Sequence, residues 1–181
     1  MMDAYTAVVS KRDRRTFRAE PVPREALSRI LNAGRMAGSA KNRQPCRFVV
    51  VDDQAMKAKL AGYGDFSRWI ADAAVNVVIV VPQDARDLDA GRAAQNMMIV
   101  ANAAGLASCP VTLQRGDEAM ALLGIPAGNR IAITVALGFP AAEGSAVAKE
   151  VADIQAMVAG PRIPLDGYVH RGGWQAGTQD R

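Results

Sequence analysis

The most constraining feature of this sequence is an apolar stretch of eight residues, Val75–Pro82, in which only Asn76 is polar. Consecutive side chains of a β-strand point to opposite faces of a sheet. A strand that is apolar at odd and even positions is therefore stable only where other elements pack on both faces of the sheet. The stretch predicts an interior strand buried on both faces. Because it is far shorter than the roughly 18 apolar residues of a membrane helix, the sequence also predicts no membrane association.

Further elements follow from hydrophobic periodicity and from glycine and proline at the expected ends. A helix over 87–104 is apolar around most of its circumference and should be buried. The chain's 181 residues suit one domain, 1–181, that combines helices with a few strands in an α/β or α+β class. The other expected elements are helices over 22–36, 116–123 and 147–158 and strands over 47–52 and 131–137.

The residue inventory excludes several kinds of chemistry. There is one histidine and two cysteines, Cys46 and Cys109, which lack C-x-x-C spacing, so neither a metal site nor a disulfide framework is expected. No motif for a serine nucleophile, a P-loop or a dinucleotide fold occurs. An enzyme built from this chain would take its reactivity from a cofactor. The two cysteines, and an N-terminal stretch without a hydrophobic signal, favour a reduced, cytoplasmic setting.

Three polar clusters could bind such a cofactor. Residues 11–18 hold five cations and one hydroxyl, which suits a phosphate, although a solvated basic arm would look the same. Residues 39–45 carry amides that suit the edge of a heteroaromatic ring, or form an ordinary turn. Residues 162–174 again offer arginines, or form a basic tail. Taken alone, each cluster is better explained by the alternative without a ligand: a solvated arm, an ordinary turn or a basic tail.

In order and spacing, these clusters resemble the nitroreductase family, whose pattern includes R-R-S-x-R, P-V-P, P-S-x-x-N-x-Q-P-W-x-F and G-[YF]-P. The similarity covers nearly the whole chain. The matching stretches are Arg14-Arg15-Thr16-Phe17-Arg18, Pro21-Val22-Pro23, Ser39-Ala40-Lys41-Asn42-Arg43-Gln44-Pro45, Gln95-Asn96-Met97-Met98, Cys109-Pro110-Val111-Thr112, Gly138-Phe139-Pro140, Arg162-Ile163-Pro164 and Val169-His170-Arg171 with Trp174.

The resemblance implies an α+β, nitroreductase-like fold, with a central, mostly antiparallel sheet flanked by helices. It also implies a homodimer with FMN at the subunit interface. Arg14, Thr16 and Arg18 would bind the FMN phosphate and ribityl chain, and Arg15 belongs to the same set. No protein residue is expected to be catalytic, because the chemistry would take place at the flavin N5.

The other implied contacts come from distant parts of the chain. Ser39 and Asn42, with Gln44 close by, would reach the flavin from the partner subunit. One flavin face would lie on the strand that ends with Pro110, Val111 and Thr112, and Arg162 and Arg171 would complete the phosphate site.

The implied activity is hydride transfer from NADH or NADPH, through FMN, to a nitroaromatic, a quinone or a similar small acceptor by a ping-pong mechanism. Two departures, Gly38 for proline and Cys46 for tryptophan, would loosen the loop beside the flavin. Only residues 61–72 and 83–92 could form a cap, so we expect an open pocket.

Two other classes remain open on the sequence. A non-catalytic flavin-binding or sensor module would share every motif but would not oxidise NAD(P)H. A nucleic-acid-binding protein would rest on the arginines alone. We expect no nucleic-acid partner, because the net charge is only +4 and the aromatic fraction only 5%.

Overall fold

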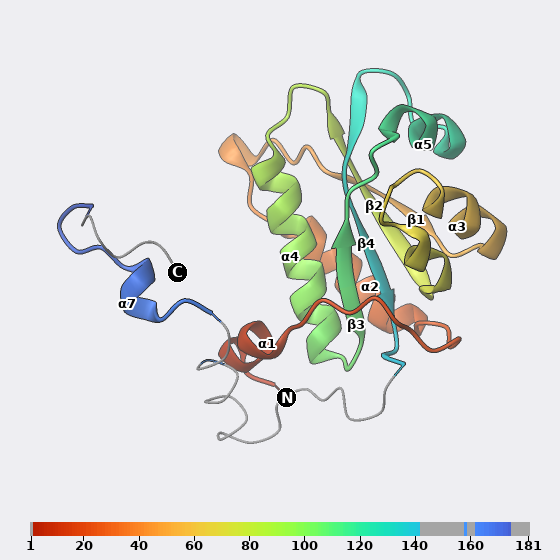
Figure 1. The fold of residues 1–181 in the computed structure, drawn as a ribbon. Coiled ribbons are helices and arrows are strands. Elements are labelled where there is room, and N and C mark those ends of the chain that lie inside the picture. The colour runs from red at the N-terminus through yellow and green to blue at the C-terminus, as the bar shows by residue number, and fades with distance from the viewer. Residues whose placement is uncertain (1, 142–157, 159–161, 175–181) are drawn as a thin grey trace. The chain divides into compact units, whose positions relative to one another are not determined.

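The computed structural model describes residues 2–141, 158 and 162–174 (Figure 1). The chain divides into two compact units, Met1–Val147 and Ala148–Arg181, and each is described by itself. In the first unit the elements are, in chain order, α1 (Ala4–Ser10), α2 (Arg24–Arg35), η1 (Ala40–Asn42), β1 (Arg47–Val51), α3 (Gln54–Ala61), η2 (Arg68–Asp72), β2 (Val75–Pro82), α4 (Asp87–Ala103), β3 (Ala107–Val111), α5 (Gly116–Leu123) and β4 (Asn129–Gly138). The second unit contains the short helix α7 (Leu165–Tyr168).

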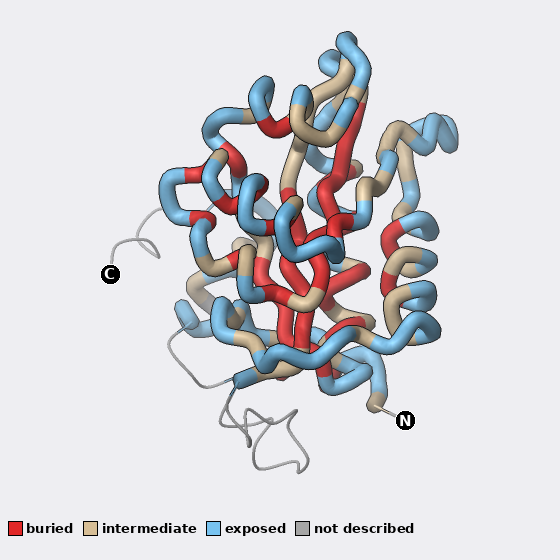
Figure 2. The backbone as a smooth tube through the Cα atoms, turned by 90° about the vertical axis from the view of Figure 1, so that its right-hand side faces the viewer, coloured by how far each residue is buried: buried red, intermediate tan, exposed pale blue. Residues whose placement is uncertain are grey.

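The four strands form one antiparallel sheet in the order β1-β2-β4-β3. β2 lies inside the sheet, as its composition predicts. Val75, Val77 and Ile79 face the core formed with α2 and α4, whereas Val78 and Val80 face the core formed with α3, η2 and α5. Figure 2 shows the buried residues running through the middle of this three-layer arrangement.

The expected helices and strands of the first unit are present with small shifts at their ends. The helix expected over 22–36 begins at Arg24, because Pro23 is its N-cap rather than part of its first turn. The helix expected over 87–104 is α4, which ends before Gly105, a residue with φ of +77°. The strand expected over 131–137 is two residues longer at its start and one at its end. The helix expected over 147–158 lies outside the described residues, apart from Val158.

α4 is buried along one side and exposed at its start. Its buried residues are alanines and two methionines, Met97 and Met98, while Leu88 is 64% exposed. α1 is fixed to the other end of α4, since the Asn102 side chain donates to the Ala7 carbonyl (3.1 Å) and to the Ser10 hydroxyl (2.9 Å). α4 therefore spans the first unit and separates two groups of predicted site residues.

Candidate active site

The arginine-rich segment 13–18 is fixed to the sheet through its backbone. Arg14 N donates to the Ser108 carbonyl of β3 at 3.1 Å, and Arg18 N donates to the Phe139 carbonyl, just after β4, at 2.9 Å. The backbone N–H groups of such a segment are hydrogen-bonded to the sheet, so its side chains remain available to bind other groups.

Two arginine side chains of this segment are stacked on aromatic rings. The Arg15 guanidinium lies 5.8 Å from the Trp69 ring centroid, and that of Arg18 lies 5.3 Å from the Phe139 ring and pairs with Glu20 at 3.1 Å. Stacking fixes the plane of a guanidinium while its N–H groups at the edge can still donate to an anion. Both side chains are exposed, so a ligand can reach them.

A cavity of about 620 Å³ opens beside the segment. One wall includes the buried Lys57, whose ammonium donates to the Ala73 carbonyl at 2.6 Å. Arg14 instead lines a crevice of about 20 Å³ near Asn102. The predicted phosphate-binding residues thus share one segment but not one cavity. The larger cavity is lined by Arg15, Thr16, Phe17, Arg18, Ala19, Glu20, Pro21, Gln54, Lys57, Ala71, Asp72, Ala73 and Ala74.

The strand predicted to support the flavin, β3, is an edge strand of the sheet. Pro110 and Val111 are half-buried and Thr112 is exposed, so the end of the strand is accessible. The preceding Cys109 is buried, and this burial raises the pKa of its thiol, although a hydrogen bond from Arg15 opposes the shift. A buried thiol whose pKa is raised is a poor nucleophile.

The loop with the predicted partner-side contacts has a strained backbone. Lys41, Asn42 and Gln44 have φ between 49° and 54°, in the left-handed region that residues with a Cβ seldom adopt. The Ser39 hydroxyl accepts a hydrogen bond from Gln44 N at 2.8 Å and closes the loop. Strain of this kind is concentrated at ligand-binding loops.

The two groups of predicted residues lie at opposite ends of α4. Ser39 and Gln44 line an apolar cavity of about 510 Å³ that includes Asp89, near the start of α4. Arg14 lines its crevice with Asn102, near the end of the helix. At 1.5 Å per residue, the intervening turns span about 20 Å. Asn42 belongs to the same loop as Ser39 and Gln44.

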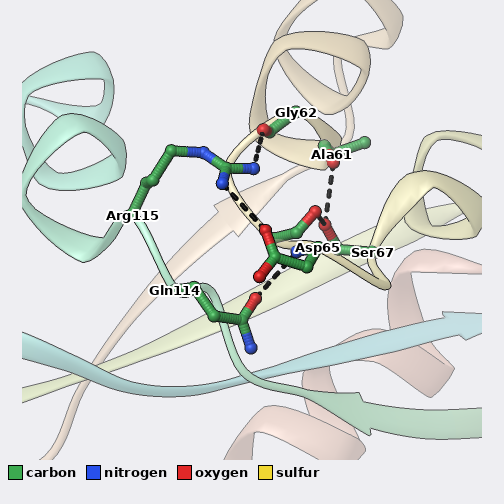
Figure 3. Close-up of polar contacts among 7 residues, drawn as sticks. Ala61, Gly62, Asp65, Ser67, Gln114 and Arg115 are labelled. Carbon is green, nitrogen blue, oxygen red and sulfur yellow. Dashed lines mark hydrogen bonds and ion pairs between the residues drawn. The ribbon is translucent and has the colours of Figure 1, made fainter.

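Loop 62–67 is held by a clamp, a set of polar contacts from Gln114 and Arg115 (Figure 3). The sequence does not predict these contacts. The Arg115 guanidinium pairs with Asp65 at 2.9 Å and donates to the Gly62 carbonyl at 2.6 Å. Asp65 N donates to the Gln114 side-chain oxygen at 2.8 Å. The loop lies within the stretch expected to form a cap, but contacts between residues about fifty positions apart leave no local signal in the sequence.

The remaining predicted residues, Arg162 and Arg171, belong to the second unit and are both exposed. In that unit the His170 and Trp174 rings are stacked with centroids 4.2 Å apart. The role of the two arginines in a phosphate site stays a prediction.

The donor set fits FMN better than a metal. Arg15, Thr16 and Arg18 provide two guanidinium groups and a hydroxyl for a phosphate, and the end of β3 provides backbone for the edge of a ring. Within residues 2–141, 158 and 162–174, no group of histidine, cysteine and acidic residues could hold a metal ion. No helix in that part of the chain is both long and apolar enough to cross a membrane.

Comparison with known proteins identifies the class. The sequence profile of the nitroreductase family matches residues 8–88 and 66–139. An NADH dehydrogenase of Thermus thermophilus is 30% identical over 186 aligned residues, which cover 80% of this chain and 90% of that protein. The chain therefore belongs to the nitroreductase family.

Solved structures with the same fold agree with this assignment. An NADPH:FMN oxidoreductase from Vibrio harveyi, complexed with NAD+, has a TM-score of 0.79 at 22% identity and covers 95% of this chain and 78% of its own. An FMN-dependent nitroreductase from Clostridium difficile has a TM-score of 0.77 at 21% identity, with coverage of 93% and 99%. The predicted family, the α+β nitroreductase-like fold and the oxidoreductase class are confirmed.

Proposed function

We propose that the protein binds FMN noncovalently and uses it to transfer hydride from NADH or NADPH to a small acceptor, such as a nitroaromatic or a quinone. The observation that carries this proposal is the fixing of the arginine segment against β3 and β4, through Arg14 N to Ser108 and Arg18 N to Phe139. These contacts support a phosphate site beside β3, because they hold the arginine segment against that edge strand and against the end of β4. Family membership supplies the cofactor class.

The residues of the chain bind and orient the cofactor. FMN, when bound, would accept the hydride and pass the electrons on. Arg15, Thr16 and Arg18, which line the larger cavity, would hold the phosphate end of the cofactor, and Arg14, which lines a separate crevice beside the same segment, would add a further charge. Pro110, Val111 and Thr112 would support one face of its ring, and a backbone N–H near Thr112 would donate to N5. The clamped loop 62–67 lies beside the same strand end, since a Cβ on Gly64 would be only 3.1 Å from the Thr112 carbonyl oxygen. In cofactor enzymes the protein contributes binding, orientation and electrostatics, while the cofactor carries the chemistry.

The partner subunit completes the site in this proposal. Ser39, Asn42 and Gln44 lie at the far end of α4 from Arg14, so within a two-fold dimer they would act on the other subunit's cofactor. The cytoplasmic location stays a prediction; it rests on the two cysteines, Cys46 and Cys109, which are both free thiols.

Steady-state kinetics with NAD(P)H and a quinone are expected to give parallel double-reciprocal plots. One open face serves both substrates, so the oxidised nicotinamide has to leave before the acceptor enters. Intersecting plots would show that both substrates bind together and would contradict the shared face. A flavin-loaded protein that does not oxidise NAD(P)H would instead be a sensor module.

We expect a homodimer that is required for folding. The exposed Leu88 and the half-buried Ile99 and Val100 leave apolar surface on α4 that a self-complementary interface would bury. Obligate interfaces of this kind bury more than roughly 2,000 Å² in total. Sedimentation velocity should detect a dimer throughout the micromolar range, and a stable, folded monomer there would contradict the prediction.

A further inference from the structure

Two polar side chains lie in the apolar interior of the sheet, Asn76 on β2 and Thr134 on β4. Both residues are fully buried. In the described part of the chain, the Asn76 side-chain oxygen Oδ1 and the Thr134 hydroxyl are the buried side-chain polar groups without a hydrogen-bond partner. Burying such a group unpaired costs its whole hydration free energy, so buried polar groups in proteins almost always have a partner.

The two groups lie on the same face of the sheet and close to each other. Asn76 pairs with Ala136 and Val78 pairs with Thr134, so the register places the two polar residues diagonally across from each other. Val78 and Ala136 belong to the core formed with α3, η2 and α5. Because alternate positions of a strand share a face, Asn76 and Thr134 face that same core.

The residue that lies between the two polar side chains is small. Ala136 is directly opposite Asn76 and two positions from Thr134, and its single methyl group fills little of the space between them. Diagonal neighbours in a sheet have Cβ atoms about 7 Å apart, and a water molecule that bridges two oxygens forms hydrogen bonds of about 2.8 Å on either side. The spacing therefore suits one bridging water.

The third strand adds a further polar neighbour. Cys109 of β3 is buried and pairs with Ala136 from the side opposite Asn76. Its sulfur is a weak hydrogen-bond acceptor. Ala136 is thus surrounded by an amide, a hydroxyl and a thiol from three neighbouring strands, and an internal water usually makes two to four hydrogen bonds of this kind.

The amide of Asn76 is fixed in its orientation. Its nitrogen Nδ2 donates to the Ile70 carbonyl of η2 at 3.0 Å. The planar amide cannot turn its oxygen to another donor without breaking this bond, so Oδ1 needs a partner that comes to it.

We propose that one internal water molecule binds over Ala136, accepts a hydrogen bond from the Thr134 hydroxyl and donates one to Asn76 Oδ1. Both groups are neutral, which favours water over an ion, whose charge would stay uncompensated in the core. The water would join β4 to β2 and, through the Asn76 amide, to η2. This inference goes beyond the proposed function, because it does not depend on FMN.

Oxygen-17 magnetic relaxation dispersion tests the proposal, because it counts the water molecules that stay bound for longer than the protein takes to tumble. Thr134→Val keeps the shape of the side chain but cannot hydrogen-bond the water, so the count should fall by one per chain. Thr134→Ser keeps the hydroxyl and should keep the count. Thr6→Val is a matched control, because the Thr6 hydroxyl donates directly to Asp3 at 2.5 Å. An unchanged count in Thr134→Val would overturn the inference.

The stability of the same variant separates a bound water from an unpaired hydroxyl. With the water in place, Thr134→Val leaves Asn76 Oδ1 without a partner and should raise the equilibrium constant of unfolding about tenfold. If the hydroxyl had no partner at all, the substitution would remove an unpaired polar group from the core and would lower that constant. Urea unfolding at one fixed protein concentration measures the change, and a lowered constant would overturn the inference.

A crystal structure of the wild-type protein locates the water directly. Electron density for it should lie within about 3.2 Å of both Asn76 Oδ1 and Thr134 Oγ1. A direct hydrogen bond between the two side chains, with no density between them, would overturn the inference. The three measurements give the same result with or without flavin, so failure of this inference can be told apart from failure of the proposed function.

Discussion

Replacing Arg14 with alanine is expected to weaken FMN binding about tenfold or more. A charge-assisted hydrogen bond to a phosphate contributes about 1.5–3 kcal/mol, and each 1.4 kcal/mol is a factor of ten in Kd. The Arg14 backbone is fixed to Ser108, so removing the side chain should leave the segment in place. The Kd is best measured by quenching of flavin fluorescence during titration of the apoprotein.

The neighbouring Arg12 offers a matched control. It lines the same crevice as Arg14, but its guanidinium already donates to the carbonyls of Val9 and Lys11, at 2.7 Å and 2.8 Å, and the family pattern assigns it no contact with FMN. Arg12→Ala removes the same charge two residues earlier in the chain. An equal loss of FMN affinity in both variants would mean that the arginines act only through their overall charge. An unchanged Kd for FMN in Arg14→Ala would count against the assigned phosphate site.

Ile79→Ala should lower the free energy of unfolding by about 2–5 kcal/mol, the usual cost of truncating a large, fully buried side chain. Ile79 has no exposed surface and lies opposite Ile133, within the core between the sheet and the helices α2 and α4. Urea unfolding followed by circular dichroism, at one fixed protein concentration, measures the loss.

Val50→Ala is the control for this experiment, since Val50 is also a β-branched residue of the sheet but is 37% exposed. Its loss should stay under about 1 kcal/mol. Similar losses for the two substitutions would mean that β2 is not the buried centre of the fold.

Much of the fold follows from local patterns in the sequence. The bounds of β2 were predicted correctly at both ends. A strand that is apolar at every position but one can be buried only inside a sheet that is covered on both faces. The helix α4 was predicted to within one residue, because Gly105 ends it in the left-handed conformation that favours glycine. By contrast, α1 and α3 were not predicted. The apolar residues of α3 do not gather on one face, and α1 has only seven residues.

The candidate site was predicted only in part, and through the family pattern rather than through spacing. The sequence shows that residues 11–18 are basic, but the contacts that fix them to Ser108 and Phe139 join segments about 100 residues apart. The clamp between Asp65 and Arg115 is also a long-range contact that no periodicity indicates. The roles of the individual arginines, and of Arg162 and Arg171 above all, stay predictions.

The bridge between the N-terminal segment and β3 also bears on aggregation. The outer edge of β3 could pair with a strand of another molecule, as any open sheet edge can. Asp13 forms a parallel bridge to Ser108 at the start of that edge, and two residues later Pro110 has no N–H to offer an incoming strand. A chain shortened by its first eighteen residues would lose the first of these protections and should form intermolecular β-sheet more readily on storage.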